Sequence, residues 1–217
     1  MCQFKSAIIL KDRVFIPDYD SYSDMLSELG IADTRENAER LFIRAELIPV
    51  NGDVFSDIST WKFNVDQDIL PDWYVEEYDK QRMIEVVKEW AKDRIHIGKD
   101  NLDISDGEGH WIKDCTTVKI HGSAQVEKIC GDTKVKNIYG NATVYRIFEN
   151  ATVDFICGNA RVDSIYGNAT IITSQCKEWA EINKTKISDN AIIKDTLAHT
   201  IYNAGGWKLK TVGELQG

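Results

Sequence analysis

The amino-acid sequence predicts an α+β N-terminal domain followed by a short β-solenoid of nine-residue repeats. The first observation behind this prediction is a nine-residue pattern that recurs through the second half of the chain. The second is a change of composition near residue 98, because all three prolines lie in the first third of the 217 residues. A chain of this length suits two modest domains. The expected boundaries are 1–98 for the α+β domain, 99–113 for a connector, 114–176 for the solenoid and 177–217 for a C-terminal cap and tail.

The repeat pattern itself predicts a β-solenoid. Each unit opens with Asn, Asp or Ser and a small residue, then has a Val, an Ile and mostly a closing Gly, as in NATVDFICG (150–158) and NARVDSIYG (159–167). Units of nine residues are too short to be helical hairpins. The small residue and the Val are two apart, so they share one side of a strand. The Ile follows three after the Val, which requires a corner or bulge between them.

Two units make a coil of 18 residues, which suits either a flattened two-faced roll or a three-sided left-handed helix. Gly followed by Asn supplies the turn with positive φ that starts the next strand. The units contain one Gly each and no regular inward carboxylate, so a calcium-binding roll is not expected. An 18-residue coil predicts two stacks of side chains, His121, Tyr139 and Cys157 on one side and Cys130, Phe148 and Tyr166 on the other.

The first 98 residues show no repeat but contain clear strand and helix signals. A helix is expected to begin at Ser21 or Ser23, which can cap it, and to end at Gly30. A second helix is expected over 73–95, where apolar residues recur at helical spacing between charges. Strands are expected at 2–10 and 14–17, which form a hairpin, and at 41–49 and 61–65.

Charge and cysteine content limit the classes of function. The net charge of −9 lies mainly in residues 1–98, which hold 12 basic and 20 acidic side chains. An acidic surface disfavours nucleic acid and anionic membranes as partners. The chain contains no apolar run long enough for a membrane span, and its start lacks a signal-peptide layout. Its five cysteines include no Cys-x-x-Cys pair, so free thiols in a reducing cytoplasm are expected.

The start of the chain offers a candidate nucleophile in Cys2. Removal of Met1 would leave a cysteine with a free α-amine, and that amine can act as the base for the adjacent thiol. This is the layout of an N-terminal-nucleophile hydrolase or transferase. The alternative interpretation is that Cys2 is a small apolar residue at the beginning of a strand.

The strand at 41–49 offers a candidate binding pair in Arg44 and Glu46, which share one face. Arg44 could bind a carboxylate or phosphate group and Glu46 its partner group. The alternative interpretation is a solvated ion pair. The acidic residues around Gln67 have no histidine nearby in the sequence, so no metal site and no cofactor are expected there.

The combination of MCQF, FIRAELIP, VDQDILPDW and Asn-Ala-Thr-Val units resembles uncharacterised proteins of phages and gut bacteria. The resemblance implies an accessory or host-defence-interfering role, and it brings no catalytic residues. The sequence therefore favours a non-enzymatic binding or assembly protein, with the solenoid as a rigid surface and the acidic domain as the recognition module. We expect a homo-oligomer, because the stacked rings of a short solenoid can present apolar faces. A cysteine hydrolase or transferase using Cys2 remains the alternative.

Overall fold

The structure is a computed structural model that is mostly β, and it divides into two compact units. The first unit is Met1–Arg94 and the second is Ile95–Gly217. The division follows the change from aperiodic to periodic sequence. The structure describes residues 5–173, 185–196, 200–204 and 209–210.

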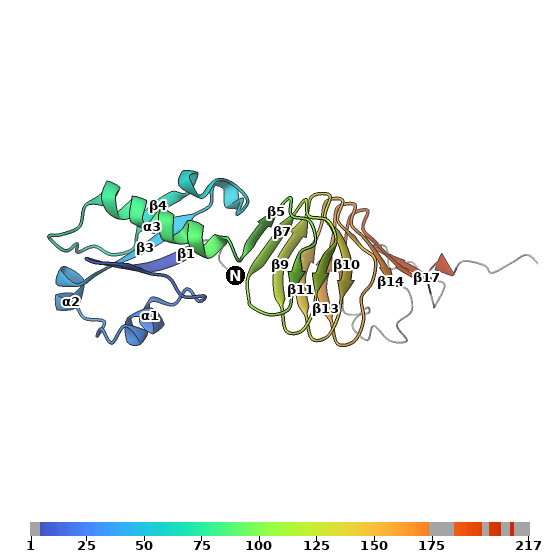
Figure 1. The fold of residues 1–217 in the computed structure, drawn as a ribbon, viewed down its shortest axis with the longest axis horizontal. Helices are drawn as coiled ribbons and strands as arrows, with labels where there is room; N and C mark the ends of the chain where they lie inside the picture. Colours follow the sequence, from blue (N-terminus) through green and yellow to red (C-terminus); the bar gives the residue numbers. More distant parts are fainter. Residues whose placement is uncertain (1–4, 174–184, 197–199, 205–208, 211–217) are drawn as a thin grey trace, which may run out of the picture. The chain divides into compact units, whose positions relative to one another are not determined.

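The first unit is built on an antiparallel sheet of four strands in the order β2-β1-β3-β4 (Figure 1). The hairpin β1–β2 forms where the apolar run of β1 meets a short charged segment that turns the chain. The strand β3 lies inside the sheet because it pairs with β1 on one side and with β4 on the other. The strands are β1 (Lys5–Leu10), β2 (Val14–Phe15), β3 (Phe42–Ile48) and β4 (Lys62–Val65).

Helices α1 (Tyr22–Glu28), α2 (Arg35–Arg40) and α3 (Glu76–Ala91) pack around this sheet. Ser21 caps α1, and its hydroxyl accepts a hydrogen bond from the backbone N–H of Asp24. The helix expected over 73–95 is shorter at both ends. The helix α2 was not expected from the sequence because it buries none of its six residues, so it has no apolar period. Single 3-10 turns lie at Val50–Gly52 and Ile58–Thr60.

Apolar side chains cover both faces of the four-stranded sheet. On one face, Met25 and Leu26 of α1 pack in a cluster with Phe42 of β3. The other face lies against α3, whose buried residues include Met83 and Val87. Figure 1 shows α3 on one side of the sheet and α1 and α2 on the other. Side chains alternate along a strand, so the residues of β3 two and four positions after Phe42 lie on the α1 side.

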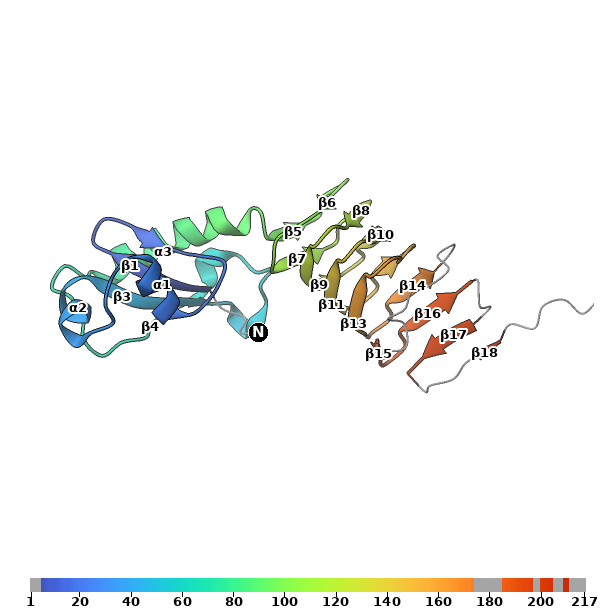
Figure 2. The same ribbon diagram turned by 90° about the horizontal axis from the view of Figure 1, so that it is seen from below.

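The second unit is a β-solenoid of about five turns across residues 95–195. Its strands form two sheets, so each coil has two faces (Figure 2). Of the two coil shapes that the sequence left open, the two-sheet roll is the one observed. The six-stranded sheet contains β5 (Ile95–Ile97), β7 (His110–Lys113), β9 (Gln125–Cys130), β11 (Thr143–Ile147), β13 (Arg161–Ile165) and β15 (Lys186–Ile187).

The second sheet of the solenoid has eight strands, and its last two pairings are antiparallel. Parallel pairing elsewhere in both sheets follows from a chain that winds in one direction. The strands of this sheet are β6 (Asp103–Ile104), β8 (Val118–Ile120), β10 (Lys134–Ile138), β12 (Thr152–Val153), β14 (Thr170–Thr173), β16 (Ile192–Asp195), β17 (Thr200–Asn203) and β18 (Leu209–Lys210).

The register of the six-stranded sheet repeats every 18 residues. Val144 pairs with Val126 on one side and with Val162 on the other, and all three side chains are buried. Ile147 is also buried, whereas the two residues between it and Val144 are only half-buried. The three-residue spacing of the buried Val and Ile is therefore accommodated by two consecutive half-buried residues, and the parallel pairing keeps its register through them.

The solenoid begins earlier and ends later than the nine-residue pattern suggests. The segment 99–113, expected to be a connector, contains β6 and β7 of the first coil. Ile104 and Ile112 occupy inward positions there, although the Asn-Ala-Thr spelling is absent. At the other end, Ala191 and Ile193 are buried and continue the ladder from β14 to β16. A coil is therefore defined by its buried, inward-pointing side chains and not by the Asn-Ala-Thr sequence at the turn.

The ring stacks follow the 18-residue spacing. His121 stacks on Tyr139 and Phe148 stacks on Tyr166, each with ring centroids 4.9 Å apart. The turns between strands carry a second ladder, in which the side-chain amide of Asn159 donates to Asn141 at 3.1 Å. These contacts run along the coil axis, so each coil is fixed by its neighbours.

Candidate binding site on the N-terminal unit

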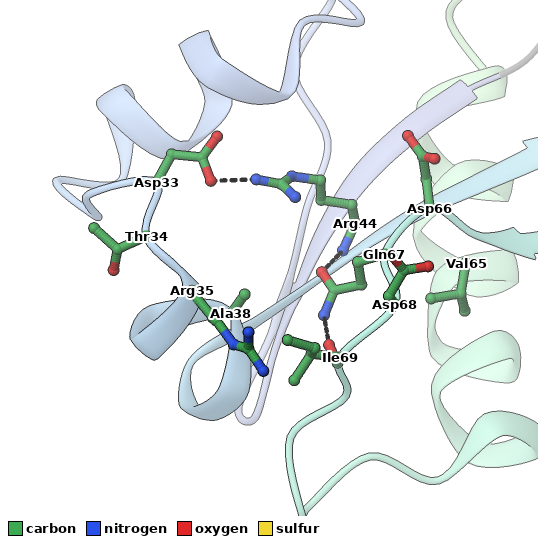
Figure 3. A pocket seen from close by; sticks show the side chains of 10 residues that line it. All are labelled: Asp33, Thr34, Arg35, Ala38, Arg44, Val65, Asp66, Gln67, Asp68 and Ile69. Carbon is green, nitrogen blue, oxygen red and sulfur yellow. Dashed lines mark hydrogen bonds and ion pairs between the residues drawn. The ribbon is translucent and has the colours of Figure 1, made fainter.

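The first unit contains a pocket of about 490 Å³ beside the middle of β3 (Figure 3). Its walls come from three segments: the turn before α2 with α2 itself, the strand β3, and the chain that leaves β4. Figure 3 shows side chains of opposite charge around this pocket. The lining residues are Asp33, Thr34, Arg35, Ala38, Arg44, Val65, Asp66, Gln67, Asp68 and Ile69.

Arg44, which the sequence singled out, lines this pocket. Its guanidinium donates to the carboxylate of Asp33 and lies 5.3 Å from the ring centre of Phe42. The Arg44 side chain is 21% exposed, against 51% for that of Asp33. A guanidinium has five N–H donors, so one ion pair leaves donors of Arg44 for another group.

Gln67 holds the chain beyond β4 against β3. Its side-chain oxygen accepts from the backbone N–H of Arg44 at 2.9 Å, and its amide donates to the carbonyl of Ile69 at 2.6 Å. The backbone N–H of Asp66 donates to the carbonyl of Arg44 at 2.9 Å. Gln67 is therefore a structural clamp, and the two acidic residues that flank it, Asp66 and Asp68, lie exposed on the pocket wall.

The lining of the pocket suits recognition by charge and hydrogen bonds. Arg35 is mostly exposed and pairs with Glu39 at 3.1 Å. The lining combines two guanidinium groups with three carboxylates, and it includes no Cys, His or Lys. Thr34, its hydroxyl residue, accepts from the backbone N–H of Asn37 as the cap of α2. The pocket therefore offers ion-pairing groups rather than an activated nucleophile.

Glu46 lies two residues beyond Arg44 on the same side of β3, and the two side chains have different partners. Glu46 accepts from the side-chain amide of Asn64 at 3.3 Å. In the sheet register, Glu46 pairs with Ser6 of β1 on one side and with Asn64 of β4 on the other. These three residues form a polar row across three adjacent strands, which we call the Ser6–Glu46–Asn64 row.

Two groups near this row are partly or fully buried. The hydroxyl of Tyr22 donates to the carbonyl of Ala45 at 3.2 Å. Burial raises the pKa of the Tyr22 phenol, and the nearby Glu46 carboxylate adds to the increase. Ser6 is 1% exposed; its hydroxyl oxygen makes no hydrogen bond of regular geometry, and the Tyr22 phenol lies beside both Ser6 and Glu46. An imperfectly satisfied buried hydroxyl in a sheet is uncommon.

Cys2 lies outside the described residues. Cys176 lies outside them as well, and of the described thiols Cys115 and Cys130 are buried and Cys157 is partly exposed. Burial raises the pKa of Cys130 to about 12 and also raises that of Cys115. These buried thiols are poor nucleophiles at neutral pH.

The solenoid carries a buried carboxylate that sequence reasoning missed. Glu127 of β9 is 5% exposed, and one of its oxygens has no hydrogen-bond partner. Its other oxygen lies 3.8 Å from the guanidinium of Arg146. Burial raises the pKa of Glu127, and Arg146 opposes the increase. The available signal was weak: an acidic residue at an outward position of a repeat unit.

The first coil also contains a chain of hydrogen bonds between buried imidazoles. Lys99 Nζ lies 3.1 Å from His96 Nδ1, and His96 Nε2 lies 3.3 Å from His110 Nδ1. His110 Nε2 lies 3.0 Å from the carbonyl of Asp106. A carbonyl only accepts, so His110 carries its proton on Nε2 in this network. The chain connects β5, β7 and the loop between β6 and β7, and we assign it a structural role.

Comparisons with protein-family models, curated proteins and solved structures find no match. Within the described ranges, no group of three or more His, Cys, Asp and Glu side chains is arranged to hold a metal ion. No described helix combines the length and the apolar character needed to cross a membrane.

Proposed function

We propose that this chain is a non-enzymatic binding protein whose N-terminal unit recognises a ligand through the Arg44 pocket. The supporting observation is a pocket with converging guanidinium and carboxylate groups and with no thiol, imidazole or amine in its lining. Ligand pockets commonly combine a few placed polar groups with an apolar wall, here Ala38 and Ile69. Arg44 is the group on which the proposal depends, because its spare N–H donors suit a carboxylate or phosphate.

We propose that the second unit serves as a rigid surface for assembly, in which nine residues are the repeating unit and two units complete one coil. Side-chain and backbone contacts between successive coils support this role. We likewise infer an α+β recognition module for the first unit and self-association of the chain. Light scattering at tens of micromolar tests the last point, and a mass near 24.7 kDa, that of one chain, would contradict it.

The resemblance to phage and gut-bacterial proteins suggests an accessory or host-defence-interfering context, with the chain acting in the cytoplasm. This context remains a proposal. The alternative function, a hydrolase or transferase that uses Cys2, depends on the chemistry of an N-terminal cysteine. The variant Cys2→Ser separates the two functions, because a binding protein keeps its ligand affinity and biological effect without the thiol.

The experiment for the binding function is a titration of the full chain with simple anions. Acetate and inorganic phosphate are the probes, and protein NMR or calorimetry is the measurement. We expect Arg44→Gln to weaken binding of the preferred anion by about tenfold or more, because a charge-assisted hydrogen bond is lost. Arg13→Gln is the matched control, since Arg13 lies outside the pocket lining. Equal affinity in the Arg44 variant and the parent would overturn the proposal.

A further inference from the structure

The Arg44 pocket and the Ser6–Glu46–Asn64 row lie next to each other on one sheet face. Arg44 and Glu46 are two residues apart in β3, and residues at this spacing point to the same side of a strand. Their backbone positions are therefore about 7 Å apart. A ligand lying along β3 can reach both side chains at once.

The two charged side chains do not neutralise each other. Arg44 pairs with Asp33, which belongs to the turn before α2, and Glu46 accepts from the neutral amide of Asn64. Arg44 thus keeps N–H donors for an anion, and the Glu46 carboxylate keeps acceptor lone pairs for a cation. Opposite charges held at a fixed separation are complementary to a molecule that carries both charges.

The Ser6 hydroxyl supplies a second, independent observation. Ser6 lies directly opposite Glu46 in the register and is 1% exposed; its hydroxyl oxygen makes no hydrogen bond of regular geometry, and the Tyr22 phenol lies beside both residues. An ammonium group has three N–H donors and no acceptor. When the Tyr22 phenol turns aside, one donor can reach Glu46 and another the Ser6 oxygen, which would satisfy both groups.

We propose that the Arg44 pocket and the Ser6–Glu46–Asn64 row together bind a small zwitterion, with its carboxylate at Arg44 and its ammonium group at Glu46. This proposal rests on the binding function proposed above and names its ligand class. The ligand carboxylate occupies the edge of the guanidinium that Asp33 leaves open. The spacing along β3 selects ligands whose two charges are about 7 Å apart.

The test is a series of ω-amino acids that differ only in the separation of their charges. Glycine, γ-aminobutyrate and ε-aminocaproate are titrated into the full chain by calorimetry. We expect affinity to rise along this series, with ε-aminocaproate about tenfold tighter than glycine. Caproate and hexylamine, which keep one charge each, should bind about tenfold more weakly than ε-aminocaproate. Equal affinity across the series, or no binding of any zwitterion, would overturn the proposal.

Variants assign each end of the ligand to its residue. Glu46→Gln should reduce the affinity for ε-aminocaproate to that for caproate and leave caproate binding unchanged. Arg44→Gln should weaken both ligands. Glu85→Gln, an exposed carboxylate on α3, is the matched control and should change neither affinity. If Arg44→Gln weakens binding and Glu46→Gln does not, the zwitterion proposal fails while the binding function stands.

The variant Ser6→Ala distinguishes a loss of ligand binding from a loss of folding. The Ser6 hydroxyl makes no hydrogen bond of regular geometry in the protein, so its removal should leave the melting temperature unchanged or higher. The same variant should weaken ε-aminocaproate several-fold and leave caproate unaffected. Unchanged affinity for ε-aminocaproate in a folded Ser6→Ala protein would contradict the placement of the ammonium group.

Discussion

The two units of this protein bury their apolar side chains in different ways. In the solenoid, the same inward positions recur in every coil, so the buried Val126, Val144 and Val162 stack in one column. In the first unit, the core joins distant segments, and Phe42 packs with Ile8 and Met25. A repeat unit is stabilised by contacts with the neighbouring coils alone. An aperiodic domain needs contacts between residues that are far apart in the sequence. The aperiodic unit is consequently the one that can form an irregular, charged pocket.

A charge inside the solenoid column gives the largest expected effect. Val144→Asp would bury an unpaired carboxylate between two neighbouring coils and should reduce the free energy of unfolding by about 3–5 kcal/mol. Thr143→Asp is the control, because the adjacent side chain points outward and is half-buried. Thermal unfolding measures both variants. Melting of V144D within a degree or two of the parent would contradict the inward position of Val144.

Substitution of a turn glycine by alanine should be less well tolerated in the solenoid than in the first unit. A Cβ on Gly122 in the solenoid would lie 2.2 Å from the backbone oxygen of Ser105 in the neighbouring coil, whereas a Cβ on Gly30 meets nothing within 4 Å. Both residues have positive φ, near 61° and 68°, so both substitutions to Ala cost about 1–2 kcal/mol for the backbone conformation. Gly122→Ala should be clearly more destabilising in thermal unfolding, because the coils must also separate. Equal melting temperatures of the two variants would show that the coils are less tightly packed than described.

The buried Glu127 provides the smallest and most pH-dependent effect. Burial raises its pKa, so the folded state binds the proton more tightly than the unfolded state does. Stability from this group is therefore present at low pH and is lost as the pH rises through the raised pKa. Glu127→Gln should increase the melting temperature at neutral pH, and the gain should disappear near pH 4, roughly the ordinary carboxyl pKa.

Asp154→Asn is the control for Glu127, because Asp154 is an exposed carboxylate in the same unit. It should change the melting temperature little at either pH. A loss of stability in Glu127→Gln at neutral pH would show that the Arg146 contact at 3.8 Å outweighs the cost of burial.

Much of the solenoid was predictable because its signals are local and repeated. The spacing of Val144 and Ile147 predicted a corner or bulge, and in the structure two consecutive half-buried residues lie between these buried side chains. The 18-residue period also predicted the stacking of His121 on Tyr139. The extent of the solenoid was predicted less well, because the first coil around Ile104 and Ile112 keeps the inward pattern without the repeated spelling.

The candidate site was predictable only in part. The sequence placed Arg44 and Glu46 on one face of β3, because successive side chains in a strand point to opposite faces of the sheet. The sequence could not provide their partners. Asp33 reaches Arg44 from the turn before α2, and Asn64 reaches Glu46 from another strand.

The sequence by itself determined the repeat, its 18-residue coil and the inward Val and Ile columns, because periodicity acts through nearest neighbours along the chain. Only the tertiary structure decided that the coil has two sheets, that Gln67 binds the backbone of β3, and that Ser6 lies opposite Glu46 beside the Tyr22 phenol. These features depend on strand register and on contacts between segments distant in sequence. No local pattern encodes them, because the same residues paired in another register would form a different surface.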